Sequence, residues 1–286
     1  MSKQTLLAVL AHPDDESFGM GGTLALYASR GADVYLVCAT RGEVGEVDDL
    51  KGHASVADLR EAELRCAAVH LGLKGVHFLD YRDSGMPGSP DNHHPHALAA
   101  QPLDEVAAKV AYYIRELCPQ VVLTFDPIGG YRHPDHIAIH QATVRAFEQA
   151  ANPSFAPDGL LPYRAQRLYF HTIPHNFLKV VVRLLRLLGK DAHKWGKNGD
   201  IDLASIAEVD FPTNARIDIR SVQKIKEQAG ACHASQGGGR MGGNLAGFIL
   251  RLFSGQENFM RAYPPVKPGE KVERDLFATV TGDKRG

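Results

Sequence analysis

The sequence contains no apolar run long enough to cross a membrane. A membrane-spanning helix needs about 20 consecutive apolar residues, and no stretch of the 286-residue chain reaches that length. The amino terminus also lacks an apolar segment followed by a small-residue cleavage site, which a secretory signal would require. We therefore expect a cytoplasmic protein that does not insert stably into a membrane.

The sequence also lacks an excess of charge of either sign. It has 32 lysines and arginines against 33 aspartates and glutamates. Proteins that bind nucleic acid usually carry a basic excess that pairs with phosphates, so no nucleic-acid partner is predicted. The composition leaves assembly into a homo-oligomer open.

Cysteine is scarce, and no two cysteines form a C-x-x-C pair. The four are Cys38, Cys66, Cys118 and Cys232. Isolated cysteines in apolar or helical segments usually act as small packing residues, so we expect free thiols. Cys232 adjoins His233, but neighbouring residues on a helix do not face each other, so a Cys–His dyad is not expected.

What the chain does contain is a regular alternation of strand-like and helix-like segments over its first 172 residues. Apolar runs of strand length are followed by segments with apolar residues at helical spacing. Such an alternation predicts a doubly wound, mostly parallel Rossmann-like α/β sheet. The expected strands are residues 5–11, 33–40, 76–79, 121–125 and 167–172, and the expected helices are residues 17–30, 55–72, 103–117 and 134–150.

The pattern loosens beyond residue 173. Residues 177–190 form a basic amphipathic segment. Such a segment is typical either of a helix at a membrane surface or of a helix that packs on the protein and exposes its cations. We favour packing. The glycine-rich stretch at 236–244 lacks the Gly-Lys-Ser/Thr ending of a phosphate-binding loop, so we expect an ordinary loop.

Three loops that leave the carboxyl ends of expected strands carry most of the reactive side chains. They are AHPDDE (11–16), DYRDSGM (80–86) and DPIGGYRHPDH (126–136). Ligands bind at this edge of a doubly wound sheet, and adjacent first and fourth strands would bring the first and last of these loops together. The three neighbouring carboxylates of the first loop repel one another. They need either the positive end of a helix or a cation to compensate them.

A bound metal ion explains the first loop best. His12 and Asp15 lie three residues apart across a tight turn, so both can face one point, and His133 or His136 can supply a third ligand. Two imidazoles, one carboxylate and an open position make a catalytic zinc site. Zinc would lower the pKa of a bound water to about 7. Asp14 could then accept a proton from that water as general base.

Plainer roles remain open for several of these residues. The acids of the first loop could simply complement the positive end of the following helix. Glu16 fits that role and a role in orienting a metal ligand equally well. Asp135 could orient an imidazole or act as a first-turn acid of the next helix. Arg60 could pair with Glu63, three residues on along the same helix face.

Taken together, these motifs resemble the PIG-L/LmbE-type family of zinc-dependent N-acetylglucosaminyl deacetylases. AHPDDE (11–16) and GGYRHPDH (129–136) are similar to the two signature loops of the family. DLREAEL (58–64), RDSGM (82–86) and HASQ (233–236) resemble weaker elements. The resemblance implies a hydrolase that removes an acetyl group from a small amidosugar.

The resemblance also implies one Zn²⁺ per chain, which Fe²⁺ or Co²⁺ could replace, and a single domain over residues 1–286. In that domain 1–172 form the α/β core, and the variable part at 173–286 walls the active site. The implied metal ligands are His12, Asp15 and His136, with Asp135 and Glu16 supporting them. The implied catalytic residues are Asp14 as base, Tyr131 as the phenol that polarises the amide oxygen, and His133 as a charged histidine that stabilises the transition state or protonates the leaving amine. The implied substrate contacts are Arg60, Asp83 and His233.

Three alternative functions stay open at this point. A zinc amidase that cleaves thiol conjugates would share every catalytic residue and differ only in its pocket. A dinucleotide-binding module would use GMGG (19–22), although the acidic first loop would repel a pyrophosphate. A sugar-binding module would lack hydrolysis. Finally, His93, His94 and His96 form either a second metal site or, as we expect, a solvated loop.

Overall fold

One mixed sheet forms the centre of the protein. The structure, a computed structural model, describes residues 3–156, 159–194, 199, 201–238 and 255–280. The strands lie in the order β3-β2-β1-β4-β5-β7-β6; β1 to β5 run parallel, and β7 runs antiparallel to β5 and β6. The predicted doubly wound, mostly parallel sheet is therefore confirmed. The strands are β1 (Thr5–Leu10), β2 (Asp33–Thr40), β3 (Gly75–Tyr81), β4 (Val121–Phe125), β5 (Arg167–Thr172), β6 (Ala215–Asp218) and β7 (Gln256–Tyr263).

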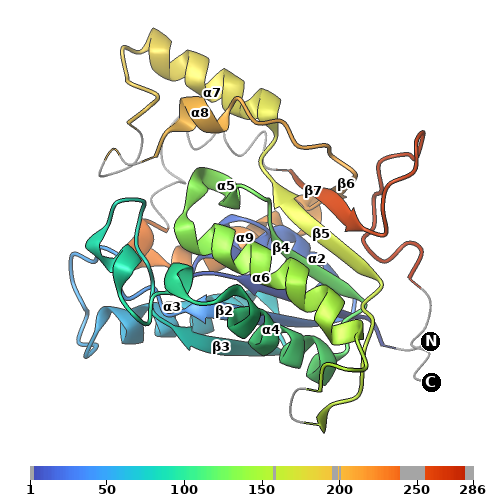
Figure 1. Ribbon diagram of the computed structural model, residues 1–286. Helices are drawn as coiled ribbons and strands as arrows, with labels where there is room; N and C mark the ends of the chain where they lie inside the picture. The colour runs from blue at the N-terminus through green and yellow to red at the C-terminus, as the bar shows by residue number, and fades with distance from the viewer. Residues whose placement is uncertain (1–2, 157–158, 195–198, 200, 239–254, 281–286) are drawn as a thin grey trace.

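Helices cover both faces of the sheet (Figure 1). α4 and α6 pack together on one face, and α2, α3 and α9 pack together on the other. Local signals define their ends: the Ser55 side chain accepts a hydrogen bond from the Asp58 N–H at the start of α3, and Gly72, with φ 73°, ends it. The helices are α1 (Asp15–Phe18), α2 (Gly21–Ser29), α3 (Val56–Leu71), α4 (Leu103–Leu117), α5 (Gly129–Arg132), α6 (Pro134–Ala151), α7 (His175–Leu187), α8 (Leu203–Ile206) and α9 (Gln223–Cys232), with 3₁₀ turns η1 (Pro90–His93), η2 (Leu98–Ala100), η4 (Arg220–Val222) and η5 (Ala234–Gln236).

Strands β1 and β4 lie side by side in the buried centre of the sheet. Leu6 of β1 is aligned with Val121 of β4, and both side chains are fully buried. Parallel neighbours of similar length end at the same edge, where ligands bind in folds of this kind. The loops that follow Leu10 and Phe125 therefore emerge next to each other, as the sequence predicted.

The single helix predicted at residues 17–30 is instead two helices. α1 and α2 are separated by Gly19 and Met20. A Cβ at position 19 would lie 2.8 Å from the backbone oxygen of Asp15. Glycine is therefore required where the chain turns sharply between the two helices.

A buried carboxylate from β7 occupies the N-terminus of α2. Glu257 accepts hydrogen bonds from the N–H groups of Gly22 (3.0 Å) and Thr23 (2.7 Å) and pairs with Lys226 of α9 at 2.6 Å. Negative charge is favourable at this end of a helix. The same N–H groups would have to hold the pyrophosphate of a dinucleotide. Their use by Glu257 argues against the dinucleotide-binding alternative.

The region beyond residue 173 adds two strands that the sequence did not predict, β6 and β7, which extend the sheet. The amphipathic helix expected at residues 177–190 is present as α7, and it packs on α8 through a small apolar cluster separate from the main core. Of the predicted loop at 236–244, only 236–238 lie within the described residues. Across the described ranges, no helix combines the length and the apolar character needed to cross a membrane.

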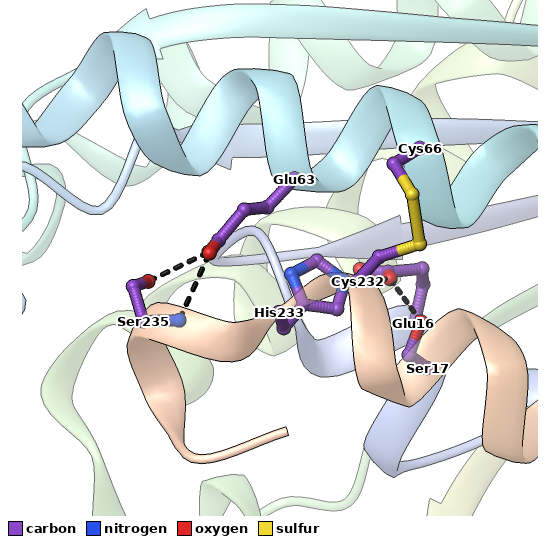
Figure 2. The surroundings of a disulfide bond; sticks show 7 residues. All are labelled: Glu16, Ser17, Glu63, Cys66, Cys232, His233 and Ser235. Atoms are coloured by element: carbon purple, nitrogen blue, oxygen red, sulfur yellow. Dashed lines mark hydrogen bonds and ion pairs between the residues drawn. A yellow bond between two sulfur atoms is a disulfide. The ribbon is translucent and has the colours of Figure 1, made fainter. Parts of the chain in front are cut away.

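The prediction that all four cysteines are free is wrong for two of them. Cys66 of α3 and Cys232 of α9 form a disulfide (Figure 2), while Cys38 and Cys118 keep their thiols. The two bonded residues are 166 positions apart in the sequence, so only the packing of α9 on α3 brings them together. Disulfides are more typical of oxidising compartments, and the expected cytoplasmic location stays a prediction.

Candidate active site

Three side chains from two loops converge at the carboxyl edge of β1 and β4. His12 Nδ1 lies 3.2 Å from His136 Nε2. The Asp15 carboxylate lies beside both rings, with Oδ1 3.3 Å from His136 Nε2 and Oδ2 3.6 Å from His12 Nδ1. A tetrahedral zinc ion with bonds of about 2.0–2.1 Å holds its ligand atoms about 3.3 Å apart. The two nitrogens and the carboxylate are therefore spaced as three ligands of one metal ion would be.

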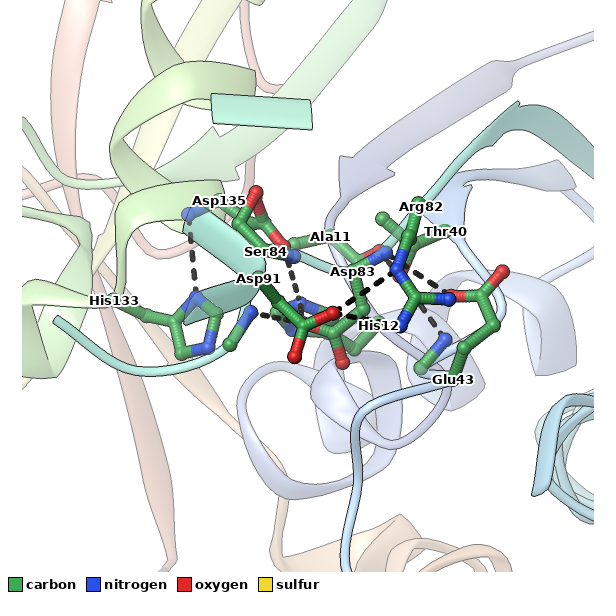
Figure 3. A network of polar contacts seen from close by, with 12 residues as sticks. Ala11, His12, Thr40, Glu43, Arg82, Asp83, Ser84, Asp91, His133 and Asp135 are labelled. Atoms are coloured by element: carbon green, nitrogen blue, oxygen red, sulfur yellow. Dashed lines mark hydrogen bonds and ion pairs between the residues drawn. The ribbon is translucent and has the colours of Figure 1, made fainter. Parts of the chain in front are cut away.

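A buried carboxylate fixes the other nitrogen of His12 (Figure 3). His12 Nε2 lies 3.0 Å from Asp135 Oδ2. Asp135 in turn accepts hydrogen bonds from the backbone N–H of Ser84, at 2.8 Å, and from its hydroxyl. When Nε2 donates to a carboxylate, Nδ1 is left with its lone pair directed at the metal position. Asp135 thus lies where a residue that orients an imidazole must lie.

The loop after β4 orients His136. Its Nδ1 lies 3.2 Å from the carbonyl oxygen of Gly129, and its ring stacks on Phe125 with centroids 3.9 Å apart. Gly129 has φ 66°, and a Cβ there would lie 2.8 Å from the Cβ of His136. Only glycine suits that position. Asp126 stabilises the turn by accepting hydrogen bonds from two backbone N–H groups that follow it.

Asp14 has a strained backbone beside the ligand cluster. Its φ of 131° lies in a region that residues with a Cβ rarely adopt, at a cost of about 1–3 kcal/mol. Two neighbours hold it there: Glu16 Oε2 accepts from the Asp14 N–H (3.0 Å), and Arg60 Nη2 donates to Asp14 Oδ2 (3.1 Å). Burial raises the pKa of Asp14 to about 6, against the lowering effect of Arg60. Such a carboxylate suits a proton acceptor.

The neighbouring Asp15 has the opposite electrostatics. Burial alone would raise its pKa, but the rings of His136 and His12 hold that pKa well below its usual value. Asp15 therefore stays ionised, as a metal ligand must be. Two adjacent carboxylates thus have pKa values pushed apart by their surroundings, which is the pattern expected when they have different roles.

Arg60 is buried under the first loop and does not pair with Glu63. Its Nη1 donates to the carbonyl of Gly42 (3.0 Å) and its Nη2 to that of Pro13 (2.7 Å). Glu63 instead accepts from the backbone N–H and the hydroxyl of Ser235, at 2.9 and 2.6 Å. The direct contact of Arg60 is with Asp14 and its loop, and its contact with a substrate stays a prediction.

His233 lies behind the first loop (Figure 2). Its Nε2 is 2.7 Å from Glu16 Oε1, and both side chains are fully buried. Burial alone would lower the pKa of His233, but the Glu16 carboxylate raises it above its usual value. Because Glu16 also holds the N–H of Asp14, His233 reaches Asp14 through one intermediary. That His233 lines the wall of the substrate pocket stays a prediction.

His133 and Tyr131 flank His136, with ring centroids 5.0 and 4.9 Å from it. His133 Nδ1 accepts the backbone N–H of Asp135 at 3.2 Å, which places the proton of the neutral ring on Nε2. Burial, with the nearby His12 and His136 rings, lowers the pKa of His133 to about 2. This geometry favours a neutral donor over the charged histidine that the resemblance implied. Burial raises the pKa of Tyr131, so its hydroxyl keeps its proton.

Asp83 lies on the far side of His12, with Oδ1 3.5 Å from Nε2. Its Oδ1 also accepts the N–H of Gly85 at 2.8 Å. Burial alone would raise its pKa, but His12 holds that pKa well below its usual value. Asp83 is thus an ionised acceptor at the edge of the cluster, and its contact with a sugar hydroxyl stays a prediction.

The hypothesised second metal site is not assembled. Besides the His12–Asp15–His136 set, the described residues that lie close enough to share a metal form the groups His12–His133–His136, His12–Asp83–Asp135 and Cys66–His70–Cys232. None includes His93, His94 or His96. In the third group the two sulfur atoms are bonded to each other.

Sequence reasoning assigned no role to Ser84 or Phe125. Ser84 holds Asp135, which fixes His12, and Phe125 stacks on His136. Their positions offered the only signal: Ser84 stands inside the RDSGM stretch, and Phe125 is the last residue of a predicted strand. Neither residue type alone indicates a contact with the metal-ligand side chains or the residues that support them.

Comparisons with known proteins show the family of the chain. A family model described as PIG-L: GlcNAc-PI de-N-acetylase matches residues 7–147. The chain is 36% identical to the 1D-myo-inositol 2-acetamido-2-deoxy-alpha-D-glucopyranoside deacetylase of Geodermatophilus obscurus, over 97% of this chain and 98% of that protein. Its identity to the protein of the same name from Thermobifida fusca is also 36%, over 97% of this chain and 100% of the relative.

A solved structure shows the same fold. The N,N'-diacetylchitobiose deacetylase of Pyrococcus horikoshii is 23% identical, with a TM-score of 0.62, and the similarity covers 90% of this chain and 83% of that one. At that identity the likeness shows the fold alone. The relatives of nearly full length show the family as well, and the residues that the family model matches, 7–147, include both loops that carry the ligand cluster. The chain belongs to the PIG-L family of deacetylases.

Proposed function

We propose that this chain is a zinc-dependent hydrolase that removes the acetyl group from the nitrogen of an N-acetylglucosaminyl-type small substrate. The proposal is carried by the triangle of His12 Nδ1, His136 Nε2 and the Asp15 carboxylate, with the buried Asp14 adjacent in the chain. Relatives 36% identical over nearly the whole chain bear the name of a deacetylase for an inositol-linked acetamido sugar. Their name supports the sugar class of the substrate.

The donor set fits zinc. Two imidazole nitrogens and one carboxylate are typical of a catalytic zinc site, and the contact from Asp135 to His12 is the support such a ligand usually has. Fe²⁺ or Co²⁺ would accept the same ligands. Bound there, zinc would supply a water with a pKa of about 7 and polarise the acetyl carbonyl.

Asp14 moves the proton in this reaction. It accepts a proton from water as the water oxygen attacks the acetyl carbon. The guanidinium of Arg60 holds one Asp14 oxygen at 3.1 Å and so fixes the direction of the carboxylate. The bond between the carbon and the amide nitrogen then breaks, and Asp14 returns the proton to that nitrogen. One water is consumed, and the products are acetate and the free amine.

Tyr131 and His133 stabilise the charge that develops on the acetyl oxygen. Both flank His136, and each has a proton to donate: the phenol hydroxyl and the imidazole Nε2–H. Removing one such donor typically costs about 3–4 kcal/mol of transition-state stabilisation. The two side chains come from one short segment, between the kink at Gly130 (φ 65°) and the start of α6 at Pro134.

Metal analysis combined with an acetate-release assay tests the proposal. Asp14→Asn should keep the metal and lose about 10²–10⁴-fold in kcat, whereas His136→Ala should lose both metal and activity. Asp104→Asn, at an exposed position on α4, serves as the matched control. Full activity in metal-free protein, or normal turnover by Asp14→Asn, would overturn the proposal.

The same assay separates the substrate classes. Inositol-linked and oligosaccharide-linked N-acetylglucosamine should both be tested for free amine, next to an amide of a thiol conjugate. Release from an acetamido sugar supports the proposed class. Hydrolysis of the thiol conjugate with no action on any acetamido sugar would support the alternative amidase instead.

A further inference from the structure

Helix α7 has three stripes of different character along its length. Residues three and four apart lie on one face of a helix. The first stripe, Leu178, Val182 and Leu185, is buried in a cluster with Ala204 and Ile206 of α8. The packing favoured from the sequence is therefore present. It occupies only one side of the helix.

A second apolar stripe faces away from that cluster. Val180, Leu184 and Leu187 are spaced four and three residues apart and are 59%, 50% and 84% exposed, and the adjoining Leu188 is 64% exposed. Single exposed apolar residues are common, but a contiguous row of large ones marks a surface that binds something. The sequence pattern alone did not separate this stripe from the buried one.

A row of cations borders the exposed apolar stripe. Lys179, Arg183 and Arg186 lie on one face of α7, and Lys190 continues the row just beyond its end; all four are exposed. The helix contains no aspartate or glutamate. Within the described part of the chain, no carboxylate forms an ion pair with Lys179, Arg183 or Arg186. The row therefore presents uncompensated positive charge beside apolar side chains.

We propose that this face of α7 binds the surface of an anionic phospholipid bilayer, with the helix axis in the plane of the membrane. An apolar stripe flanked by lysine and arginine is the arrangement that inserts among acyl chains while the cations reach lipid phosphates. Charge complementarity selects this partner: the whole chain is near neutral, with 32 basic and 33 acidic residues, whereas the charged residues of α7 are all basic. Thirteen residues span about 20 Å, which is too short to cross a bilayer and suits a helix that lies on one.

The position of α7 gives this contact a consequence for the site. The cluster that anchors α7 includes Ile128 and Tyr131, and the Tyr131 ring lies 4.9 Å from that of His136. Figure 1 shows α7 and α8 beyond α5 at one end of the molecule. A bound bilayer would therefore lie on the side of the protein that carries the ligand cluster. The proposal does not depend on the reaction assigned above.

Vesicle co-sedimentation of the full-length protein tests the proposal. The probes are vesicles of phosphatidylcholine alone and of phosphatidylcholine mixed with phosphatidylglycerol. The protein should bind the anionic vesicles, and added salt should weaken that binding. Changing Lys179, Arg183 and Arg186 to Gln should lower the partition coefficient about fivefold for each cation removed. The double variant Leu184→Glu/Leu187→Glu should lower binding at least tenfold.

The matched control is Leu161→Glu, which places the same change at a leucine 81% exposed, in the connection between α6 and β5, at the end of the molecule opposite α7 (Figure 1). It should bind like the wild type, and unchanged thermal unfolding of all variants would show that they fold. Binding to neutral vesicles as tightly as to anionic ones, or no loss in the α7 variants, would overturn the proposal. So would a dimer in sedimentation velocity that Leu184→Glu/Leu187→Glu abolishes while vesicles bind nothing, because the stripe would then join two copies of the chain.

Discussion

Arg60 shows how the surroundings of one residue decide its chemistry. The sequence offered a substrate contact or a surface pair with Glu63. In the structure its guanidinium is buried and donates to Asp14 and to two backbone carbonyls of the loops around it. Residue type alone could not predict this contact, because Arg60 and Asp14 are 46 positions apart in the chain. Arg60 thus lies where a residue that positions the proposed base would lie, buried and in contact with Asp14.

Kinetics of Arg60→Met can separate positioning from substrate binding. Methionine keeps part of the apolar stem and removes the donors that hold Asp14. If Arg60 positions the base, kcat should fall about 10- to 100-fold with KM little changed, because an interaction that matters in the transition state is lost. If Arg60 instead holds the substrate, KM should rise while kcat is kept. Arg65→Met, on the exposed side of the same helix, is the matched control and should behave like the wild type.

Elements formed by local patterns were predicted with the correct bounds. The strands at 33–40, 121–125 and 167–172 and the helix at 103–117 agree with β2, β4, β5 and α4, because each is a run of one periodicity between clear stop signals. The helix predicted at 17–30 failed for a different reason. A carboxylate more than 230 positions away stabilises the new N-terminus at α2, and no local pattern can report such a partner.

The pH dependence of stability should reveal Glu257. Burial alone would raise the pKa of Glu257, but Lys226 and the N–H groups of α2 hold that pKa below its usual value. Because the folded pKa is lower than the unfolded value of about 4.3, the stabilisation is complete above that value and is lost as pH falls through the folded pKa. Glu257→Gln should therefore reduce the free energy of unfolding by about 1–3 kcal/mol at pH 7.

The measurement is urea unfolding of both proteins at neutral pH and at about pH 3. The difference in free energy of unfolding between wild type and Glu257→Gln should become smaller at the lower pH, because protonation removes the same charge from the wild type. Glu208→Gln, at an exposed position, should have the free energy of unfolding of the wild type at both pH values. A difference between wild type and Glu257→Gln that is the same at both pH values would mean that the charge of Glu257 does not stabilise the fold.

At the scale of the whole molecule, the contacts that close the structure join distant parts of the chain. β7 completes the sheet between β5 and β6, Glu257 of β7 holds α2, and the disulfide ties α9 to α3. None follows from periodicity, because each depends on which elements pack together. The ligand cluster could be predicted from the sequence only because parallel strands end at a common edge of the sheet. The family resemblance supplied the roles of its members, which stay proposals.

The disulfide between Cys66 and Cys232 should stabilise the whole fold. It closes a loop of 166 positions, and cross-links of long loops typically contribute about 2–5 kcal/mol by restricting the unfolded chain. Cys66→Ser should therefore lower the free energy of urea unfolding by that amount under non-reducing conditions. Adding a phosphine reductant should lower the free energy of unfolding of the wild type to that of the variant. The value for the variant should not change, because it has no disulfide to reduce. Cys118→Ser, at a cysteine outside the disulfide, should keep both the stability and the response to reductant.

Labelling of the urea-unfolded, unreduced wild type tests whether the disulfide is present. Two thiols should react, those of Cys38 and Cys118, whereas four reactive thiols would show that α3 and α9 are joined by packing alone.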